Sequence, residues 1–238
     1  MKAMIFAAGL GTRLKPLTDN IPKALVKINN KTLLEILIIK LKNFGFDEIG
    51  INVHHFSDKI ISFLEKKNFF NIKIKIFKEK KLLDTGGALK KSENFFKDEK
   101  AFLVHNVDIL SDINLKNFYD FHIKNKPMVS IAVQNRKSSR SFLFNDKNFL
   151  IGWRNLSTKE IKLCVKNQNY KALAFSGIHI ISPDIFKKIK DNGNFSIVKT
   201  YLEICKKEKI IAFEHTKNYC MDLGTHKNLK EAENYLKK

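Results

Sequence analysis

The chain has 238 residues, of which 44% are apolar, with only 10 glycines and 4 prolines. This composition excludes a disordered, collagenous or repeat-array protein, and the length predicts one large α/β domain. The formal net charge is +20, yet only four of the 44 basic residues are arginine, the side chain favoured for bidentate contacts to bases and phosphates, so we expect no nucleic-acid partner.

The cysteines and the apolar runs indicate where the protein resides. Cys164, Cys205 and Cys220 have no metal-ligand spacing and leave one cysteine over from any disulfide, which predicts a reducing cytoplasm. The apolar run 3–10 leads into a glycine-bearing loop, and later runs are far shorter than the ~20 residues that span a bilayer. We therefore expect a cytoplasmic protein with no membrane partner.

Along the first half, strand and helix patterns alternate. Residues 3–7 predict a strand, a glycine-bearing loop follows, and residues 33–44 predict a helix, with Thr32 and Glu35 as its capping box and Gly45 just past its end. A strand at about 48–53 and a helix opened by Ser57 come next. Isoleucines that alternate with lysines at 72–76 predict a half-exposed strand near a sheet edge. This order favours a mostly parallel sheet covered by helices on both faces.

In the second half of the chain the regular alternation of strands and helices ends. Strands are expected at about 101–105 and 128–133, with a helix from about residue 115 between them. Short strands near 142–144, 149–151 and 174–181 predict antiparallel pairing. Ser182 before Pro183, then Ser196 and Thr225, are predicted helix N-caps. Together these patterns predict a three-layer α/β domain.

The loop after the first strand is the first candidate site. Glycines there let backbone amides turn toward a phosphate, and polar side chains add donors. The dinucleotide fingerprint fails because Leu14 takes its third glycine position, and the Walker pattern is absent. The residues of this loop that could contact a phosphate are Ala8, Gly9, Gly11, Thr12 and Arg13.

Three later segments also carry residues suited to a ligand. Gly86 and Gly87 open a predicted helix, which suggests close backbone approach. The strand 102–106 leads to Asp108, and the carboxyl ends of parallel strands are where open α/β sheets bind ligands. Asp222 precedes the last helix, where it could act as a cap, although Thr225 can fill that role.

The run Gly9-Leu-Gly-Thr-Arg-Leu-Lys-Pro-Leu-Thr18, followed by Pro22-Lys23, resembles the signature of sugar-1-phosphate nucleotidyltransferases. The resemblance extends over nearly the whole chain. It implies a Rossmann-like three-layer α/β/α fold of the nucleotide-diphospho-sugar transferase type, with a mostly parallel mixed sheet. It also implies a single domain over residues 1–238, with a nucleotide-binding half at about 1–110 and a sugar-phosphate-binding half at about 111–238.

The same resemblance implies residue roles. Arg13 would contact the outer phosphates and Lys23 would lie near the attacked phosphorus, so these two are the expected catalytic residues. Asp108 and Asp222 would hold Mg²⁺. Contacts to the nucleotide are expected from Ala8, Gly9, Gly11, Thr12, Arg13, Gly86, Gly87 and Asn106. Contacts to the sugar phosphate are expected from Ser176, Gly177 and Arg154.

This sequence departs from the family pattern at three places. Val107 replaces a glycine, and Asp84 stands where glycine is usual. The usual Glu-Lys-Pro segment is missing, and Arg154 lies in roughly that region, either as the cation for the sugar phosphate or as a surface residue.

The segment Asp84-Thr-Gly-Gly87 looks closest to the N-acetylmuramate-1-phosphate uridylyltransferase branch. The predicted reaction joins a nucleoside triphosphate, with UTP favoured, to a sugar 1-phosphate, giving an NDP-sugar for cell-wall or surface-glycan precursors. Alternatives are a mannose- or heptose-1-phosphate guanylyltransferase and a phosphocholine-type cytidylyltransferase. Outside this class, a basic nucleic-acid-binding protein stays open, and the oligomeric state is not predicted.

Overall fold

The computed structural model describes residues 1–165 and 169–237. Its main strands are β1 (Lys2–Phe6), β4 (Glu48–Val53), β5 (Lys73–Lys78), β6 (Phe102–Asn106), β8 (Val129–Gln134), β9 (Arg140–Phe144), β10 (Leu150–Asn155), β11 (Glu160–Leu163), β12 (Lys171–Ile181) and β13 (Ile210–Glu214). In these described residues they form one ten-stranded sheet in the order β11-β10-β9-β12-β6-β1-β4-β5, and β8 pairs with both β12 and β13. Smaller strands are β2 (Lys27–Ile28), β3 (Lys31–Thr32), β7 (Ile109–Ser111) and β14 (Cys220–Asp222).

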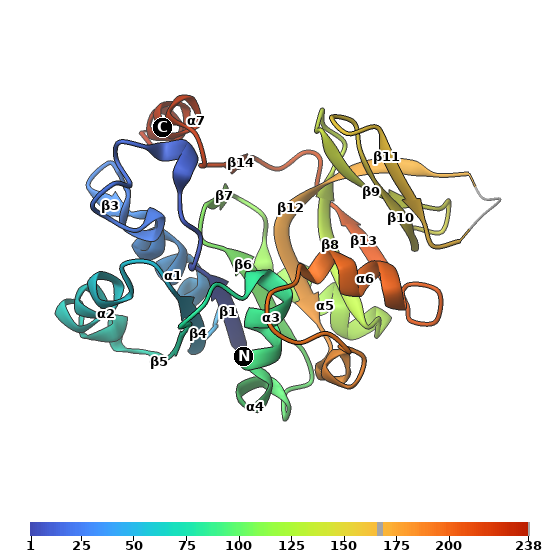
Figure 1. Ribbon diagram of the computed structural model, residues 1–238, viewed down its shortest axis with the longest axis horizontal. Coiled ribbons are helices and arrows are strands. Elements are labelled where there is room, and N and C mark those ends of the chain that lie inside the picture. The colour runs from blue at the N-terminus through green and yellow to red at the C-terminus, as the bar shows by residue number, and fades with distance from the viewer. Residues whose placement is uncertain (166–168, 238) are drawn as a thin grey trace.

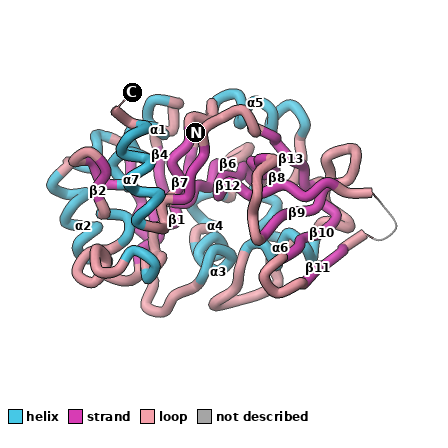
Figure 2. Tube along the Cα trace, turned by 90° about the horizontal axis from the view of Figure 1, so that it is seen from above, coloured by secondary structure: helices cyan, strands magenta, loops and turns pink. Residues whose placement is uncertain are grey.

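Helices cover both faces of this sheet, as Figure 2 shows. On one side lie α1 (Leu33–Asn43) and α5 (Leu115–Asn125), and on the other α3 (Asp84–Lys91), α4 (Glu93–Phe96) and α6 (Ile197–Ile204). Two further helices, α2 (Ser57–Lys66) and α7 (His226–Tyr235), lie with the N-terminal half of the chain (Figure 1). The described residues include no helix long and apolar enough to cross a membrane.

Each helical layer buries its own cluster of apolar side chains against the sheet. One cluster joins α1, α2, α5 and α7 to one face of the sheet, and it includes Leu34, Leu64 and Phe118. The other joins α3, α4 and α6 to the opposite face, and it includes Leu89, Phe96 and Tyr201. Because β1 and β6 are covered on both faces, they are almost continuously apolar. The predicted three-layer α/β/α fold with a mixed sheet is confirmed.

Several predicted helix ends are confirmed by hydrogen bonds. The side chains of Thr32, Ser196 and Thr225 each accept a bond from a backbone amide of the helix they precede. The predicted start at Ser57 is also confirmed, since Ser57 is the first residue of α2 and Phe56 precedes it in a left-handed conformation (φ 53°).

The direction of the strands changes at β12, and this change positions the site. Strands β6, β1, β4 and β5 are parallel, so their carboxyl ends share one edge of the sheet. β12 runs antiparallel to β6, β8 and β9, and from there β10 and β11 form an antiparallel extension. The predicted edge strand at 72–76 corresponds to β5, which ends the sheet on that side.

Candidate active site

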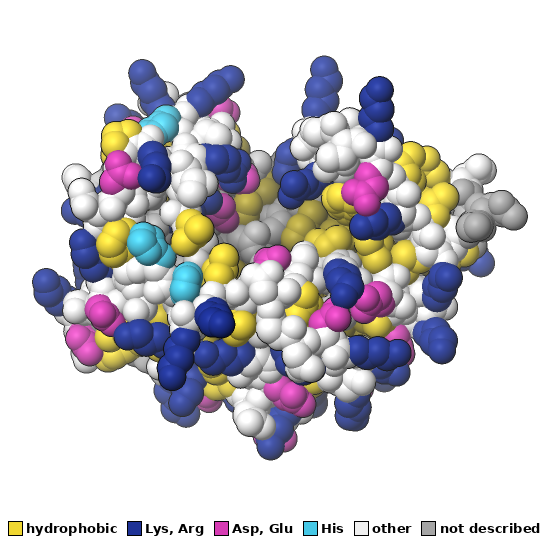
Figure 3. All heavy atoms as spheres, viewed as in Figure 1, with side chains coloured by type: hydrophobic (Ala, Val, Ile, Leu, Met, Phe, Trp, Pro, Cys, Tyr) yellow, Lys and Arg dark blue, Asp and Glu magenta, His cyan; other side chains and the backbone are white. Residues whose placement is uncertain are grey.

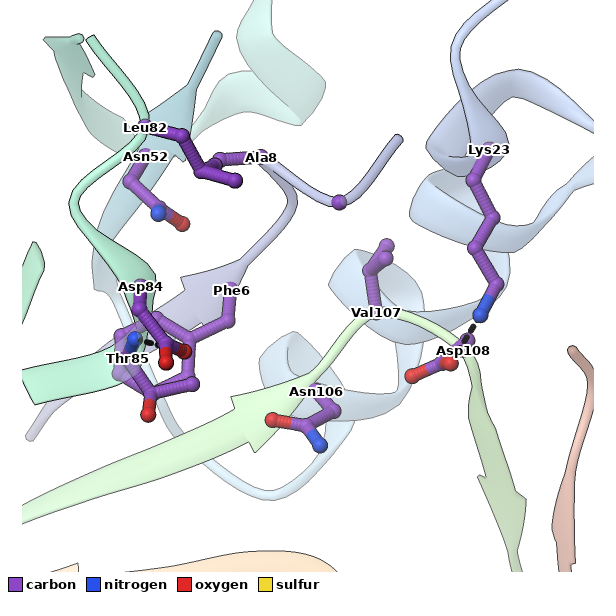
Figure 4. A pocket seen from close by; sticks show the side chains of 11 residues that line it. Phe6, Ala8, Lys23, Asn52, Leu82, Asp84, Thr85, Asn106, Val107 and Asp108 are labelled. Atoms are coloured by element: carbon purple, nitrogen blue, oxygen red, sulfur yellow. Dashed lines mark hydrogen bonds and ion pairs between the residues drawn. The ribbon is translucent and has the colours of Figure 1, made fainter. Parts of the chain in front are cut away.

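A pocket of about 220 Å³ lies at the carboxyl ends of β1, β4 and β6. Figure 3 shows that this face of the molecule is hollowed between its two halves. Parallel strands bring segments that are distant in sequence to one edge, which is why this edge of an α/β sheet binds ligands. The lining residues are Phe6, Ala8, Gly9, Lys23, Asn52, Leu82, Asp84, Thr85, Asn106, Val107 and Asp108 (Figure 4).

The loop that follows β1 forms one wall of this pocket. Ala8 and Gly9 line it, and Gly9 has no other heavy atom near the position of a side chain. Gly11 has a positive φ of 68°, and a Cβ there would come within 2.9 Å of Thr18. A larger residue would therefore both strain and crowd the turn. Beyond it, Thr12 and Arg13 are exposed and do not line the pocket directly.

Lys23 and Asp108 form an ion pair at one end of the pocket (Figure 4). Lys23 begins a short 3-10 segment (Lys23–Leu25) after Pro22, and Asp108 lies just beyond β6. Their side chains are only 11% and 18% exposed, so the pair is largely screened from solvent. Charged groups in such surroundings interact more strongly than in water. Asp108 can therefore hold the Lys23 ammonium in place for contact with a bound anion.

Asp222 lies close to Asp108 because β14 pairs with β7. Asp222 is opposite Ile109 in that ladder, and the Leu223 amide donates to the Asp108 carbonyl over 2.8 Å. The Asp222 carboxylate accepts a hydrogen bond from the Gly224 amide (2.7 Å) and lies 3.5 Å from the Arg13 guanidinium. The structure thus brings together the predicted residues Arg13, Asp108 and Asp222.

A lysine on α1 holds the strand β7, which directly follows Asp108. Lys40 in α1 donates to the carbonyl oxygen (2.6 Å) and hydroxyl (3.0 Å) of Ser111, the last residue of β7. Burial lowers the pKa of Lys40 to about 8, and the nearby Cys220 and Asp112 oppose this shift. The ammonium therefore ties α1 to the strand that follows Asp108.

Asn52 and Glu79 form a buried network that the sequence analysis missed. Asn52 accepts from the Ala7 amide (2.9 Å) and donates to the Glu79 carboxylate (2.8 Å). The other carboxylate oxygen of Glu79 accepts from the Leu83 amide over 3.0 Å. This network joins the loop after β1 to the segment before α3. The signal available in the sequence was an asparagine inside a buried strand, since such a group needs a partner.

Glu79→Ala is expected to lower the free energy of unfolding by about 2 kcal/mol, because the Asn52 amide and the Leu83 amide would lose their buried acceptor. Chemical denaturation followed by circular dichroism measures the change. Glu65→Ala, at an exposed position on α2, is the matched control and should be near neutral. Equal stability of the two variants would contradict this role for Glu79.

Asp84 and Thr85 line the pocket opposite Lys23, but the two glycines after them do not (Figure 4). The Gly86 and Gly87 amides donate to the Phe195 carbonyl over 2.8 and 3.4 Å. A Cβ on Gly86 would lie 2.3 Å from the Phe195 ring, and one on Gly87 would lie 2.0 Å from the Gly193 carbonyl. These glycines allow α3 to pack closely against residues 193–195. From this segment, Asp84 and Thr85 are therefore the residues that line the pocket.

The predicted sugar-phosphate residues are divided by the structure. Gly177 has φ 69° at a bulge in β12, and a Cβ there would come within 2.9 Å of the Asn106 side chain, which lines the pocket. Ser176 is fully buried, and its hydroxyl is 2.8 Å from Nε2 of His215. Ser176 is not among the residues that line the pocket. Arg154 lies on β10 and does not line the pocket, and its buried Nε has no hydrogen-bond partner among the described residues.

Two histidines behind the pocket contribute no charge to it at neutral pH. Burial lowers the pKa of both His105 and His179 to about 3. Among the lining residues Lys23 is the cation, and Asp84 and Asp108 are the carboxylates. The pocket therefore combines a positive group and a carboxylate at one end with a carboxylate at the other.

Comparison with known proteins agrees with this geometry. The family model described as nucleotidyl transferase matches residues 2–238. A D-glycero-alpha-D-manno-heptose 1-phosphate guanylyltransferase from Campylobacter jejuni is 30% identical, over 94% of this chain and 95% of its own length. A structure of HddC from Yersinia pseudotuberculosis complexed with GMP-PN has a TM-score of 0.79 and 25% identity, and 99% of each chain is covered.

Other relatives are longer than this chain. A mannose-1-phosphate guanyltransferase from Aspergillus oryzae is 28% identical over 96% of this chain, which spans 62% of that relative's length. A UTP–glucose-1-phosphate uridylyltransferase from Synechocystis is 30% identical over 83% of this chain and 53% of its own length. This chain thus spans between about half and two thirds of the length of these relatives.

Proposed function

This chain belongs to the nucleotidyl transferase family, and we propose that it transfers a nucleotidyl group from a nucleoside triphosphate to a sugar 1-phosphate, with release of pyrophosphate. The observation that carries the proposal is the composition of the pocket. The loop after β1, Lys23, the Asp84–Thr85 segment and the Asn106–Asp108 strand end all meet there. These are the segments whose sequences resemble the family's substrate-binding motifs.

In the proposed reaction an oxygen of the sugar 1-phosphate attacks the α-phosphorus of the nucleotide. A new P–O bond forms, the bond from the α-phosphorus to the bridging oxygen breaks, and pyrophosphate leaves with that electron pair. The nucleophile is already an anion, so no protein base has to remove a proton. Catalysis then depends on positioning and on neutralising charge, which are the main contributions in phosphoryl-transfer sites.

Lys23 and Arg13 are suited to these tasks. The Lys23 ammonium is held in the pocket by Asp108 and can face the reacting phosphate without reorganisation of solvent. Arg13 is exposed at the outer end of the loop, beside Asp222, where it can contact the outgoing phosphates. Asn106 and Gly177 lie next to each other where the sugar would be placed.

The carboxylates of Asp108 and Asp222 fit a magnesium ion. Mg²⁺ is commonly held by one or two carboxylates, and water and substrate phosphates complete its shell. Asp108 and Asp222 each offer a hard oxygen donor, and the β7–β14 ladder brings their backbones together. The described residues contain no group of three or more histidine, cysteine or acidic side chains that could enclose a metal alone. When bound, the ion would supply positive charge to the nucleotide phosphates.

For the substrates we propose GTP and a sugar 1-phosphate of the manno configuration. Relatives named for guanylyl transfer to mannose 1-phosphate and to a manno-heptose 1-phosphate support this choice. Asp84 supports it chemically, because a carboxylate can accept hydrogen bonds from N1 and N2 of guanine. Uracil presents one N–H between two carbonyl oxygens, and a carboxylate beside it would face an acceptor. UTP, which the Asp84–Gly87 pattern favoured in the sequence analysis, is the alternative.

GTP is expected to be preferred over UTP by at least about tenfold in kcat/KM, since sites built around a hydrogen-bonded edge discriminate strongly. Asp84→Asn should reduce turnover of GTP by about tenfold, because one acceptor becomes a donor. The substitution is isosteric and can keep the Thr85 amide bond to Oδ1, now 2.6 Å long. Steady-state kinetics with both triphosphates measure both effects.

Turnover of UTP by the Asp84→Asn variant serves as the internal control, and it should change little. A clear UTP preference of the unmodified enzyme would move the assignment to a uridylyltransferase. Equal losses with both triphosphates would mean that Asp84 does not read the base.

The reaction class itself is tested by a pyrophosphate-release screen. Each nucleoside triphosphate is combined with a panel of sugar 1-phosphates in the presence of Mg²⁺, and nucleotide-sugar formation is followed by mass spectrometry. We expect stoichiometric pyrophosphate and nucleotide-sugar with at least one pair. Pyrophosphate release that does not depend on a sugar phosphate would contradict the proposal.

A further inference from the structure

Two of the three cysteines lie side by side, away from the pocket. Cys164 directly follows β11, and Cys205 caps the C-terminal end of α6. Their Sγ atoms lie 2.9 and 3.4 Å from the same carbonyl oxygen, that of Leu202. A strand at the edge of the sheet and a helix of the covering layer thus meet at two free thiols.

Small reagents can reach this pair. Both side chains are partly exposed. Cys164 lines a surface cavity of about 600 Å³ between the β9–β11 extension and α6, together with Trp153 and Leu202. Cys205 lines a neighbouring cavity of about 370 Å³. The thiols therefore lie between two openings to solvent.

The two thiols, which lie against the same carbonyl oxygen, differ in acidity. Interaction with the neighbouring Cys205 thiol, together with Lys206, lowers the pKa of Cys164, although burial opposes this shift. Interaction with Cys164 and burial raise the pKa of Cys205. The thiolate is the reactive form of cysteine, so Cys164 is the nucleophile of the pair and Cys205 is placed to react second.

We propose that Cys164 and Cys205 are a redox-active dithiol site that forms a reversible intramolecular disulfide when the protein meets a hydroperoxide. The Cys164 thiolate attacks the terminal oxygen of the hydroperoxide, the O–O bond breaks with its electron pair on the leaving oxygen, and a sulfenic acid is formed. The leaving oxygen takes a proton from solvent and departs as the alcohol, or as water when the oxidant is hydrogen peroxide. Cys205 Sγ then attacks Cys164 Sγ, the S–O bond breaks, and water leaves with the thiol proton of Cys205. The peroxide gains the two electrons that the thiols lose, and an external dithiol reverses the reaction.

The bond would join β11 to α6, the two walls of the larger cavity. At its other end α6 contacts the active-site pocket, because the Ile197 amide donates to the Thr85 hydroxyl over 3.0 Å. The proposed disulfide therefore fixes the helix that supports one side of the pocket. This inference does not depend on the proposed substrates.

The test is mild oxidation of the reduced full-length protein with hydrogen peroxide in the presence of a chelator, followed by alkylation, intact mass and non-reducing peptide mapping. We expect loss of two hydrogen atoms per chain, a linked peptide that contains Cys164 and Cys205, and reversal by dithiothreitol. Trp153 is the single tryptophan of the chain and shares the cavity with Cys164, so its fluorescence should change on oxidation.

Matched variants assign the bond. Cys220 is the control, because it lies on β14, which pairs with β7 rather than with β11, and Cys220→Ser should behave like the unmodified protein. Cys164→Ser, Cys164→Ala and Cys205→Ser should give neither the linked peptide nor the reversible fluorescence change. The proposal is overturned if all three thiols survive, if Cys220 is the linked partner, or if only sulfinic acids or intermolecular disulfides form.

Discussion

Lys23→Ala is expected to lower kcat by about a thousandfold, the loss typical when a preorganised charge that faces the transition state is removed. The Lys23 ammonium is largely screened from solvent and ion-paired with Asp108, so it is fixed before substrate arrives. Its removal leaves the developing charge on the phosphates without a protein partner in the pocket. Single-turnover and steady-state kinetics with saturating nucleotide measure the loss.

Lys27→Ala is the matched control, because Lys27 is exposed on β2 in the same segment of the chain. Circular dichroism and thermal unfolding of both variants separate a catalytic loss from a loss of folded protein. A kcat for Lys23→Ala within tenfold of the unmodified enzyme, with the protein folded, would exclude Lys23 as the catalytic cation.

Asp108→Asn and Asp222→Asn are each expected to lower kcat/KM by about a thousandfold at a fixed magnesium concentration, and the double variant should lose little more than either single one. Residues that act as one unit give such non-additive losses. An amide keeps the shape of the carboxylate but removes its charge, so each single variant should also need more Mg²⁺ for half-maximal activity. Kinetics at several magnesium concentrations measure both quantities.

Asp112→Asn provides the control for this pair. Asp112 is exposed just after β7, and its carboxylate accepts a hydrogen bond from the Tyr235 hydroxyl over 3.3 Å. Its substitution should leave the magnesium dependence unchanged. If the losses for Asp108→Asn and Asp222→Asn multiply in the double variant, the two carboxylates act independently and do not share an ion.

Local sequence patterns were enough to predict those helix ends and strands that depend only on residues close together in the chain. The strand at 48–53 has the predicted bounds, and the predicted caps Thr32, Ser196 and Thr225 all hold backbone amides. Alternation of isoleucine and lysine placed β5 at a sheet edge. The reason is that capping, turn formation and burial periodicity each depend on neighbours within about one turn or one strand.

Local patterns carry no information about packing partners that are distant in the sequence. Glycines at 86 and 87 have the composition of a ligand loop, but their amides bind the Phe195 carbonyl, more than a hundred residues away. Ser176 lies in a motif that resembles a sugar contact, yet its hydroxyl faces His215 inside the protein. Strands β13 and β14 were not predicted, and each is held by a strand from much earlier in the chain, β8 and β7 respectively.

The sequence by itself determined the α/β class, the phosphate-type loop after β1 and the identities of Arg13, Lys23, Asp108 and Asp222 as candidates. Only the tertiary structure decided which groups touch. Lys23 meets Asp108 across 85 residues, and Asn52 meets Glu79 across 27. It also brought Cys164 to Cys205 at the edge of the sheet. These contacts depend on strand order and register, which arise from long-range pairing and burial and leave no local periodicity in the chain.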